Sequence, residues 1–139
     1  MRAVTVAILV SAAALVFADE LCLSTPAGGK VDGKTFDYTV SRDDVIGTPI
    51  WPQKDEHPPL SPRRAQEIAR KELGKLVKNI DEWSLRGIVL FDMGDHLHWI
   101  FKIHFDRTYP ADVAVFGADY FDMPVLMDGK VIPPRGIYQ

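Results

Sequence analysis

The sequence is poor in the features that disulfide-stabilised folds and nucleic-acid binding require. Cys22 is the only cysteine, so no disulfide can form within the chain. Lys and Arg number 16 against 19 Asp and Glu, for a formal net charge of −3. Nucleic-acid binding without sequence preference needs clustered basic side chains that displace phosphate counterions. We therefore expect no nucleic-acid partner. The sequence also contains no internal repeat, so it gives no sign of a solenoid.

Motifs of catalysis are also missing. No serine lies in a Gly-x-Ser-x-Gly turn, the setting of a hydrolase nucleophile; those beyond the N-terminal apolar run are Ser24, Ser41, Ser61 and Ser84. The Gly28-Gly29 pair neither follows a clear strand nor opens a helix, as a phosphate-binding loop would. We expect a protein that is not an enzyme, with no catalytic residue and no cofactor.

One long apolar run is present, at the N-terminus. Ala3–Phe17 follows a single basic residue and precedes Ala18, a small residue of the kind that a signal peptidase reads. A run of about 15 residues is shorter than the roughly 20 that a membrane-spanning helix needs. We expect residues 1–18 to be a signal peptide cleaved after Ala18. The mature protein is then periplasmic or secreted and keeps no stable membrane anchor.

A strict alternation of apolar residues marks the stretch Asp95–Asp106. In a β-strand, every second side chain points to the same face. The alternation therefore predicts a central strand with one buried face, formed by Leu97, Trp99, Phe101, Ile103 and Phe105.

One strong helix is predicted before that strand. Ser61 is a favoured N-cap residue, and Pro62 suits the first helical position because its missing N–H has no partner there in any case. Apolar residues then recur at spacings of three and four, which places them on one stripe. That stripe, expected to cover the central strand, consists of Ala65, Ile68, Ala69, Leu73, Leu76 and Val77.

The segment 19–60 is expected to lie outside the main α+β domain, to which we assign residues 61–139. It begins with a Gly-rich stretch, Leu21–Gly33, that indicates a loose arm. Lys34–Val40 alternates as a short strand does. Five prolines then exclude a regular helix or an inner strand over residues 47–62, a linker pinned to the domain by Ile50 and Trp51.

Four strands are predicted after the helix in addition to the central one. Trp83–Phe91 is expected to pair with it, with Trp83, Leu85, Val89 and Phe91 facing the core. That pairing requires an odd-length loop or a bulge around Gly94 and places Arg86 opposite Lys102.

Farther on, residues 112–116 and 120–127 read as strands, the second confined to an edge or a bulge by Pro124. Asp128-Gly129 indicates a type I′ hairpin turn into a last strand, 130–132. Helix and hairpins together predict an α+β fold, with one main helix packed across an antiparallel β-sheet.

Several of these segments together resemble the small exported PepSY and PepSY-like domains. They are Pro59–Pro62 with Ala65 and Ala69, Trp99–Ile103, and Val125–Val131. The resemblance covers about Leu60 to Pro133, and a cystatin-like topology would produce much the same pattern. It implies a non-catalytic binding or regulatory module whose partner is a protein or peptide, a peptidase being one such partner.

A metal site is the sharpest alternative. His96 and His98, two apart on the expected strand, would have α-carbons about 6.7 Å apart on one face, close enough for both rings to reach one ion. Asp92 would lie opposite His96 as a third ligand. His104 is about 20 Å farther along the strand and cannot join them. An outward-facing histidine is more often simply a half-exposed polar residue, so the metal reading is the weaker one.

Two function hypotheses follow. The first is an exported non-catalytic module that binds a protein or peptide through its open sheet face or an edge strand. The second is an envelope protein that binds a small ligand or metal through His96 and His98. If the second sheet face is uncovered, Ile88, Leu90 and Ile100 would form an apolar patch there, as at partner surfaces and homo-oligomer contacts.

Overall fold

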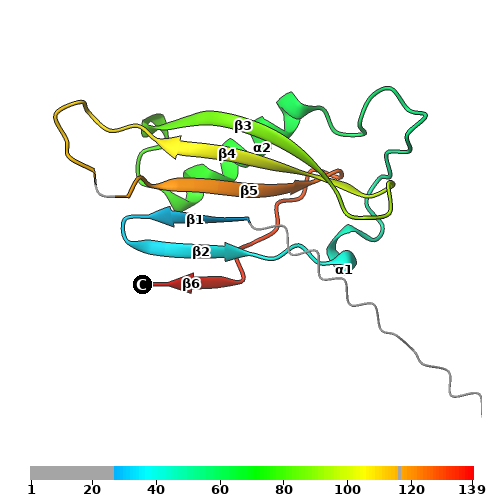
Figure 1. Ribbon diagram of the computed structural model, residues 1–139, viewed down its shortest axis with the longest axis horizontal. Helices are drawn as coiled ribbons and strands as arrows, with labels where there is room; N and C mark the ends of the chain where they lie inside the picture. Colours follow the sequence, from blue (N-terminus) through cyan, green and yellow to red (C-terminus); the bar gives the residue numbers. More distant parts are fainter. Residues whose placement is uncertain (1–26, 116) are drawn as a thin grey trace, which may run out of the picture.

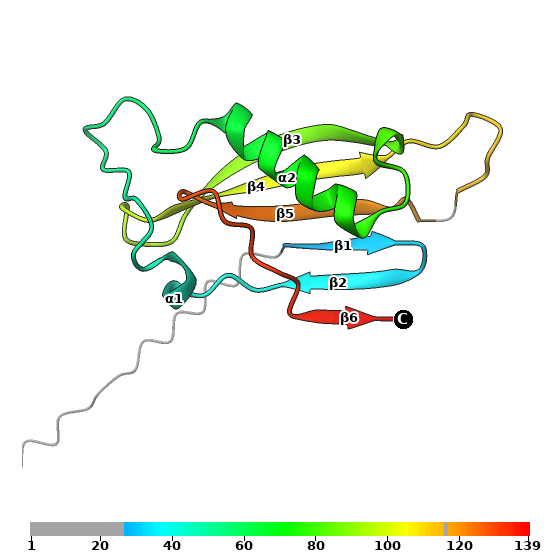
Figure 2. The ribbon, with the colours of Figure 1, turned by 180° about the vertical axis from the view of Figure 1, so that it is seen from behind.

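A computed structural model of the protein describes residues 27–115 and 117–139. The expected signal peptide and Cys22 lie outside these residues. The described chain forms one six-stranded sheet in which every pair of neighbours is antiparallel, and one long helix lies on one face (Figures 1 and 2). The α+β prediction, with one main helix across an antiparallel sheet, is confirmed.

The order of strands across the sheet differs from their order in the chain. It runs β3-β4-β5-β1-β2-β6, so the N-terminal hairpin lies between β5 and β6. The elements are β1 (Ala27–Val31), β2 (Lys34–Tyr38), α1 (Arg42–Val45), α2 (Pro62–Leu76), the 3-10 helix η1 (Ile80–Glu82), β3 (Trp83–Asp92), β4 (Trp99–Arg107), β5 (Tyr120–Leu126) and β6 (Gly136–Tyr138).

The expectation of a loose arm is wrong for residues 27–33. Ala27–Val31 is strand β1, which pairs with both β2 and β5 and so belongs to the same sheet as the strands that follow residue 61. Asp32 and Gly33 have φ of 48° and 80°, as the two central residues of a type I′ turn require. Asp-Gly is a strong hairpin signal. Here the neighbouring glycines made the whole segment resemble a loose arm, so the hairpin was not predicted.

The predicted helix is α2, and its start is confirmed. The Ser61 side chain accepts a hydrogen bond from the backbone N–H of Arg64, and Pro62 opens the helix. Ala65, Ala69 and Leu73 are fully buried, while Ile68 and Val77 pack partly buried on the core. Leu76, at the last helical position, is 36% exposed, so it does not belong to the buried stripe as predicted.

Strand β4 carries the core as predicted, over part of its expected length. Phe101, Ile103 and Phe105 are at most 1% exposed and pack in the same cluster as the helix residues Ala65, Ala69 and Leu73. Trp99 is half-buried. The strand begins at Trp99, so Leu97 lies in the preceding loop and is 40% exposed, contrary to the prediction.

The sequence predicts an odd-length loop or a bulge around Gly94. The pairing of β3 with β4 does contain a bulge, but at another position. Leu85 lies opposite Phe105, but Gly87 lies opposite His104, so one extra residue, Arg86, is bulged out. Beyond the bulge, Ile88 and Leu90 face the helix and pack on its core, whereas Val89 is 44% exposed.

The bulge therefore corrects three expectations for this hairpin. Val89 and Phe91 lie on the face opposite the predicted one. The loop from Met93 to His98 is even in length. Arg86 pairs with the Asp106 carboxylate at 3.2 Å, so no like-charge contact with Lys102 arises.

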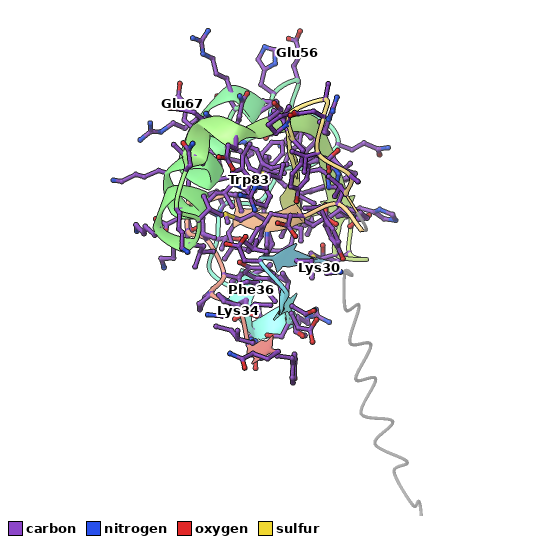
Figure 3. The ribbon with its side chains drawn as sticks, turned by 90° about the vertical axis from the view of Figure 1, so that its left-hand side faces the viewer. Lys30, Lys34, Phe36, Glu56, Glu67 and Trp83 are labelled. Carbon is purple, nitrogen blue, oxygen red and sulfur yellow. The ribbon has the colours of Figure 1, made fainter. Side chains whose placement is uncertain are left out.

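The second sheet face is covered at one end, so the expected apolar patch does not form. Ile100 is fully buried in a smaller cluster, where Val40, Val45, Leu126 and Ile132 surround it. Ile88 and Leu90 face the other way, toward α2. In the end-on view, α2 lies on one side of the sheet and Trp83 lies in the layer between them (Figure 3).

The C-terminal third departs most from prediction. Residues 111–115 form no strand, and Val113 and Val115 are exposed. β5 is an inner strand; it tolerates Pro124 because β1 pairs with β5 only at Tyr120 and Phe121, so the missing N–H removes no bond to β1.

The turn at Asp128-Gly129 exists, but only Gly129 has positive φ, so it is not type I′. The return segment makes a single bridge, between Val125 and Val131, in place of the predicted strand 130–132. The last strand is β6, which the sequence pattern did not indicate.

The aromatic ring of Phe121 joins the N-terminal hairpin to the rest of the sheet. The ring is fully buried, with the rings of Phe36, Tyr38 and Trp83 5.1–6.1 Å away between centroids. A Cβ at Gly29 would lie 2.8 Å from carbons of this ring. Residue 29 must therefore be glycine for the ring to lie flat on the backbone of β1.

Replacing Gly29 with valine should destabilise the protein by about 1–3 kcal/mol, the usual effect of overfilling a packed core. Gly74→Ala is the matched control: no atom lies within 4 Å of the added Cβ, and alanine in a helix interior should stabilise by about 0.5–1 kcal/mol. Urea unfolding midpoints of the purified proteins measure both. A Gly29→Val protein as stable as wild type would contradict the packing described here.

Candidate binding cleft

The loop Met93–His98 is shaped by two aspartates. The Asp92 carboxylate accepts the backbone N–H groups of Gly94 and His96, and the Asp95 carboxylate accepts those of Leu97 and His98. His96 has φ of 59°, which lies outside the strand region. The alternating pattern therefore continues into a loop, because aspartate side chains take the N–H groups that a strand would give to its neighbour.

The two histidines of this loop are held separately. His98 Nδ1 lies 2.6 Å from the Asp95 carboxylate, and His96 Nδ1 pairs with Asp92. The prediction that His96 and His98 share a strand face, with Asp92 opposite, is wrong because neither histidine is in a strand. Among the described residues no group of three His, Cys, Asp or Glu side chains is arranged to hold a metal ion.

A long linker passes over this loop and is fixed to it. The N–H of Trp51 donates to the Leu97 carbonyl at 2.8 Å, and its indole N–H donates to the Asp55 carbonyl at 3.0 Å. The Asp55 N–H in turn donates to the Pro52 carbonyl at 2.9 Å. Trp51 pins the linker as predicted, whereas Ile50 is 47% exposed and does not.

Two tryptophans meet where the linker crosses the start of β4. The rings of Trp51 and Trp99 are 5.4 Å apart between centroids at an interplanar angle of 64°, an edge-to-face contact. The indole N–H of Trp99 is buried and has no hydrogen-bond partner among the described residues. Trp99 thus joins the central core to the surface of the linker.

A cleft opens beside this pair. It has a volume of about 450 Å³ and is lined by Trp51, Gln53, Asp55, His96 and Trp99. The two indoles supply apolar walls, while an amide, a carboxylate and an imidazole supply polar groups. This combination of apolar walls and a few polar groups, at a volume above about 300 Å³, is typical of ligand-binding sites. We call it the tryptophan cleft.

Asp95, in the loop beside the cleft, and Asp55, in its lining, differ in their electrostatic surroundings. Burial opposes ionisation of Asp95, but the N–H of His98, the His98 ring and the N–H of Leu97 outweigh it and hold the pKa of that carboxyl well below its usual range. Asp55, by contrast, is exposed, and its hydrogen bonds with described residues are those of its backbone N–H and carbonyl. Asp55 is therefore free to meet a ligand.

Two other polar clusters have structural roles. Arg107 bridges the carboxylates of Asp119, Asp32 and Glu82 at 2.8–3.0 Å, which raises the pKa of its guanidinium and ties β4 to the turn of the N-terminal hairpin. A second pocket of about 410 Å³ beside Arg107 contains no unpaired cation among the described residues. These contacts account for the charged residues there without a ligand.

On the open sheet face, His104 lies between two carboxylates. Its Nδ1 is 2.7 Å from Asp122 and its Nε2 is 3.0 Å from Asp106, which also pairs with Arg86. This row links β5, β4 and β3. Both ring nitrogens of His104 thus contact carboxylates of the sheet itself.

Comparison with known proteins adds no identity. No protein-family model, no curated protein and no solved structure matches the chain significantly. Among the described residues, no helix has both the length and the apolar character to cross a membrane. The case for a function therefore depends on the geometry of the cleft.

The Asp95 pair should make stability depend on pH. A carboxyl whose folded pKa is depressed stabilises the fold above its unfolded pKa of about 3.9, and this stabilisation is lost as pH falls toward the folded value. Wild type should therefore lose stability more steeply than Asp95→Asn between about pH 5 and pH 2. Urea midpoints across this range measure the difference, with Asp112→Asn, an exposed carboxylate elsewhere, expected to follow wild type. Parallel curves for Asp95→Asn and wild type would refute this assignment.

Proposed function

We propose that this protein is an exported, non-catalytic binding module that recognises a protein or peptide partner through the tryptophan cleft. The single observation that carries the proposal is the cleft itself, in which two indoles and a free carboxylate are presented on one surface. Tryptophan is among the residues that dominate binding energy at protein interfaces. The basic residue and apolar run at the N-terminus support export.

Rigidity of the cleft supports recognition. Three backbone-anchored hydrogen bonds hold the linker between Trp51 and Asp55, and Trp99 is rooted in the central core. A binding surface that is already ordered loses less conformational entropy when a partner docks. The cleft thus has the preorganisation that a recognition site needs, although it lies on a loop.

The proposal keeps the family resemblance as its finer part. One helix across an antiparallel sheet is the architecture that a PepSY-like domain would have, with a cystatin-like arrangement as the alternative. A PepSY-like module that restrains a peptidase would be non-enzymatic itself.

A small-ligand function for the same cleft is the second candidate. The volume of about 450 Å³ falls in the range of small-molecule sites, and His96, a residue of the earlier small-ligand hypothesis, lines it. A small molecule that raises the melting temperature of the protein by binding would favour this candidate. No stabilisation across a broad panel would favour a macromolecular partner.

Replacing Trp51 with alanine should weaken peptide binding at least tenfold, because a central aromatic contact contributes more than about 1.4 kcal/mol. Peptides selected from a displayed library on the wild-type protein provide the probe, and fluorescence anisotropy measures their affinity. Ile50→Ala is the control: it removes the adjacent exposed side chain, which does not line the cleft, and should change affinity less than twofold. Selected peptides that bind Trp51→Ala as well as wild type would exclude the cleft.

A further inference from the structure

The walls of the cleft have the electrostatic character that attracts a cation. The face of an indole ring carries the negative part of its quadrupole, and tryptophan is the strongest aromatic partner for cationic groups. Trp51 and Trp99 stand at 64° to each other, so they present two differently oriented indole surfaces beside one space. No lysine or arginine is among the residues that line it.

The carboxylates around the cleft are not equivalent. Asp92 and Asp95 are saturated by backbone N–H groups and by their histidines. Asp55 lines the cleft, and its carboxylate contacts no cation among the described residues. Its backbone is fixed on both sides, by Pro52 and by the Trp51 indole. Asp55 therefore brings to the lining of the cleft a carboxylate that no described cation pairs with.

We infer that the tryptophan cleft takes an arginine side chain of the partner, an inference that rests on the proposed function. A guanidinium is planar, so it stacks on an indole face, and it can donate two parallel hydrogen bonds to one carboxylate. Lysine carries a compact, strongly hydrated charge and can do neither equally well. The Trp51, Trp99 and Asp55 side chains match all three properties of arginine: its flat face, its charge and its paired donors.

The tip of the β3–β4 hairpin forms one border of the cleft. His96 lies at the rim with its side chain 86% exposed, and its ring is paired with Asp92. Glu56, next to the cleft in sequence, points outward from the linker in the end-on view (Figure 3). Asp55 is therefore the carboxylate that we assign to the guanidinium.

The experiment compares three versions of one peptide. The probe is the tightest peptide from the library selection, made with arginine, lysine or citrulline at the position whose replacement with alanine weakens binding most. Citrulline keeps the shape of arginine but has no charge. Affinities are measured against wild type, Asp55→Asn and Asp112→Asn. Asp112 is an exposed aspartate in the loop between β4 and β5, at the opposite end of the sheet (Figure 1).

On wild type and on Asp112→Asn, we expect citrulline to bind at least tenfold more weakly than arginine, and lysine to lie between them. On Asp55→Asn the gap between arginine and citrulline should shrink to less than threefold. Tight peptides that depend on Trp51 but tolerate citrulline within twofold would overturn the arginine assignment and leave the proposed function standing. Failure to select any peptide whose binding depends on Trp51 would overturn both.

Discussion

The packing of one aromatic ring on bare backbone is the contact on which the six-stranded sheet depends. β1 and β5 share only two paired positions, Gly29 with Phe121 and Lys30 with Tyr120. So short a ladder is a weak join between the N-terminal hairpin and the rest of the sheet. The Phe121 ring extends that join, because it lies on residue 29 while the rings of Phe36 and Tyr38 approach it from β2. Burial of these side chains therefore provides the stability that the short hydrogen-bonded ladder between β1 and β5 lacks.

The position of the hairpin explains why the cleft exists. Because β1 and β2 lie beside β5, the chain leaves β2 on the far side of the sheet from β3 and β4, and it must return to begin α2. The linker makes this return past the tip of the β3–β4 hairpin (Figure 2). Its prolines exclude a regular helix over this crossing. A turn closed by the Asp55 N–H and the Pro52 carbonyl holds the chain beside the hairpin tip. Trp51 thereby reaches Trp99, and the cleft is a consequence of the strand order.

Structural features that depend on neighbouring residues in the chain could be predicted from the sequence. Features that depend on tertiary packing could not. Ser61-Pro62 and the stripe on α2 were readable because capping and periodicity are properties of neighbouring residues. The Arg86 bulge was not, since an extra residue in a strand is selected by the partner strand. Alternation at residues 95–98 misled because two aspartates accept the backbone N–H groups there. Asp32-Gly33 was an available signal that the flanking glycines obscured.

The residues of the candidate site could likewise be predicted from the sequence only where their spacing along the chain revealed them. His96 and His98 attracted a metal hypothesis because their spacing is visible in the sequence, yet each ring is occupied by a different aspartate. Trp51 and Trp99 have no spacing rule, since they come together only when the linker crosses the hairpin. Such a site is rigid because the hydrogen bonds that fix the linker form when the protein folds, before any partner binds. Recognition by the cleft then depends on the charge and shape that the partner brings, because the protein has little left to order.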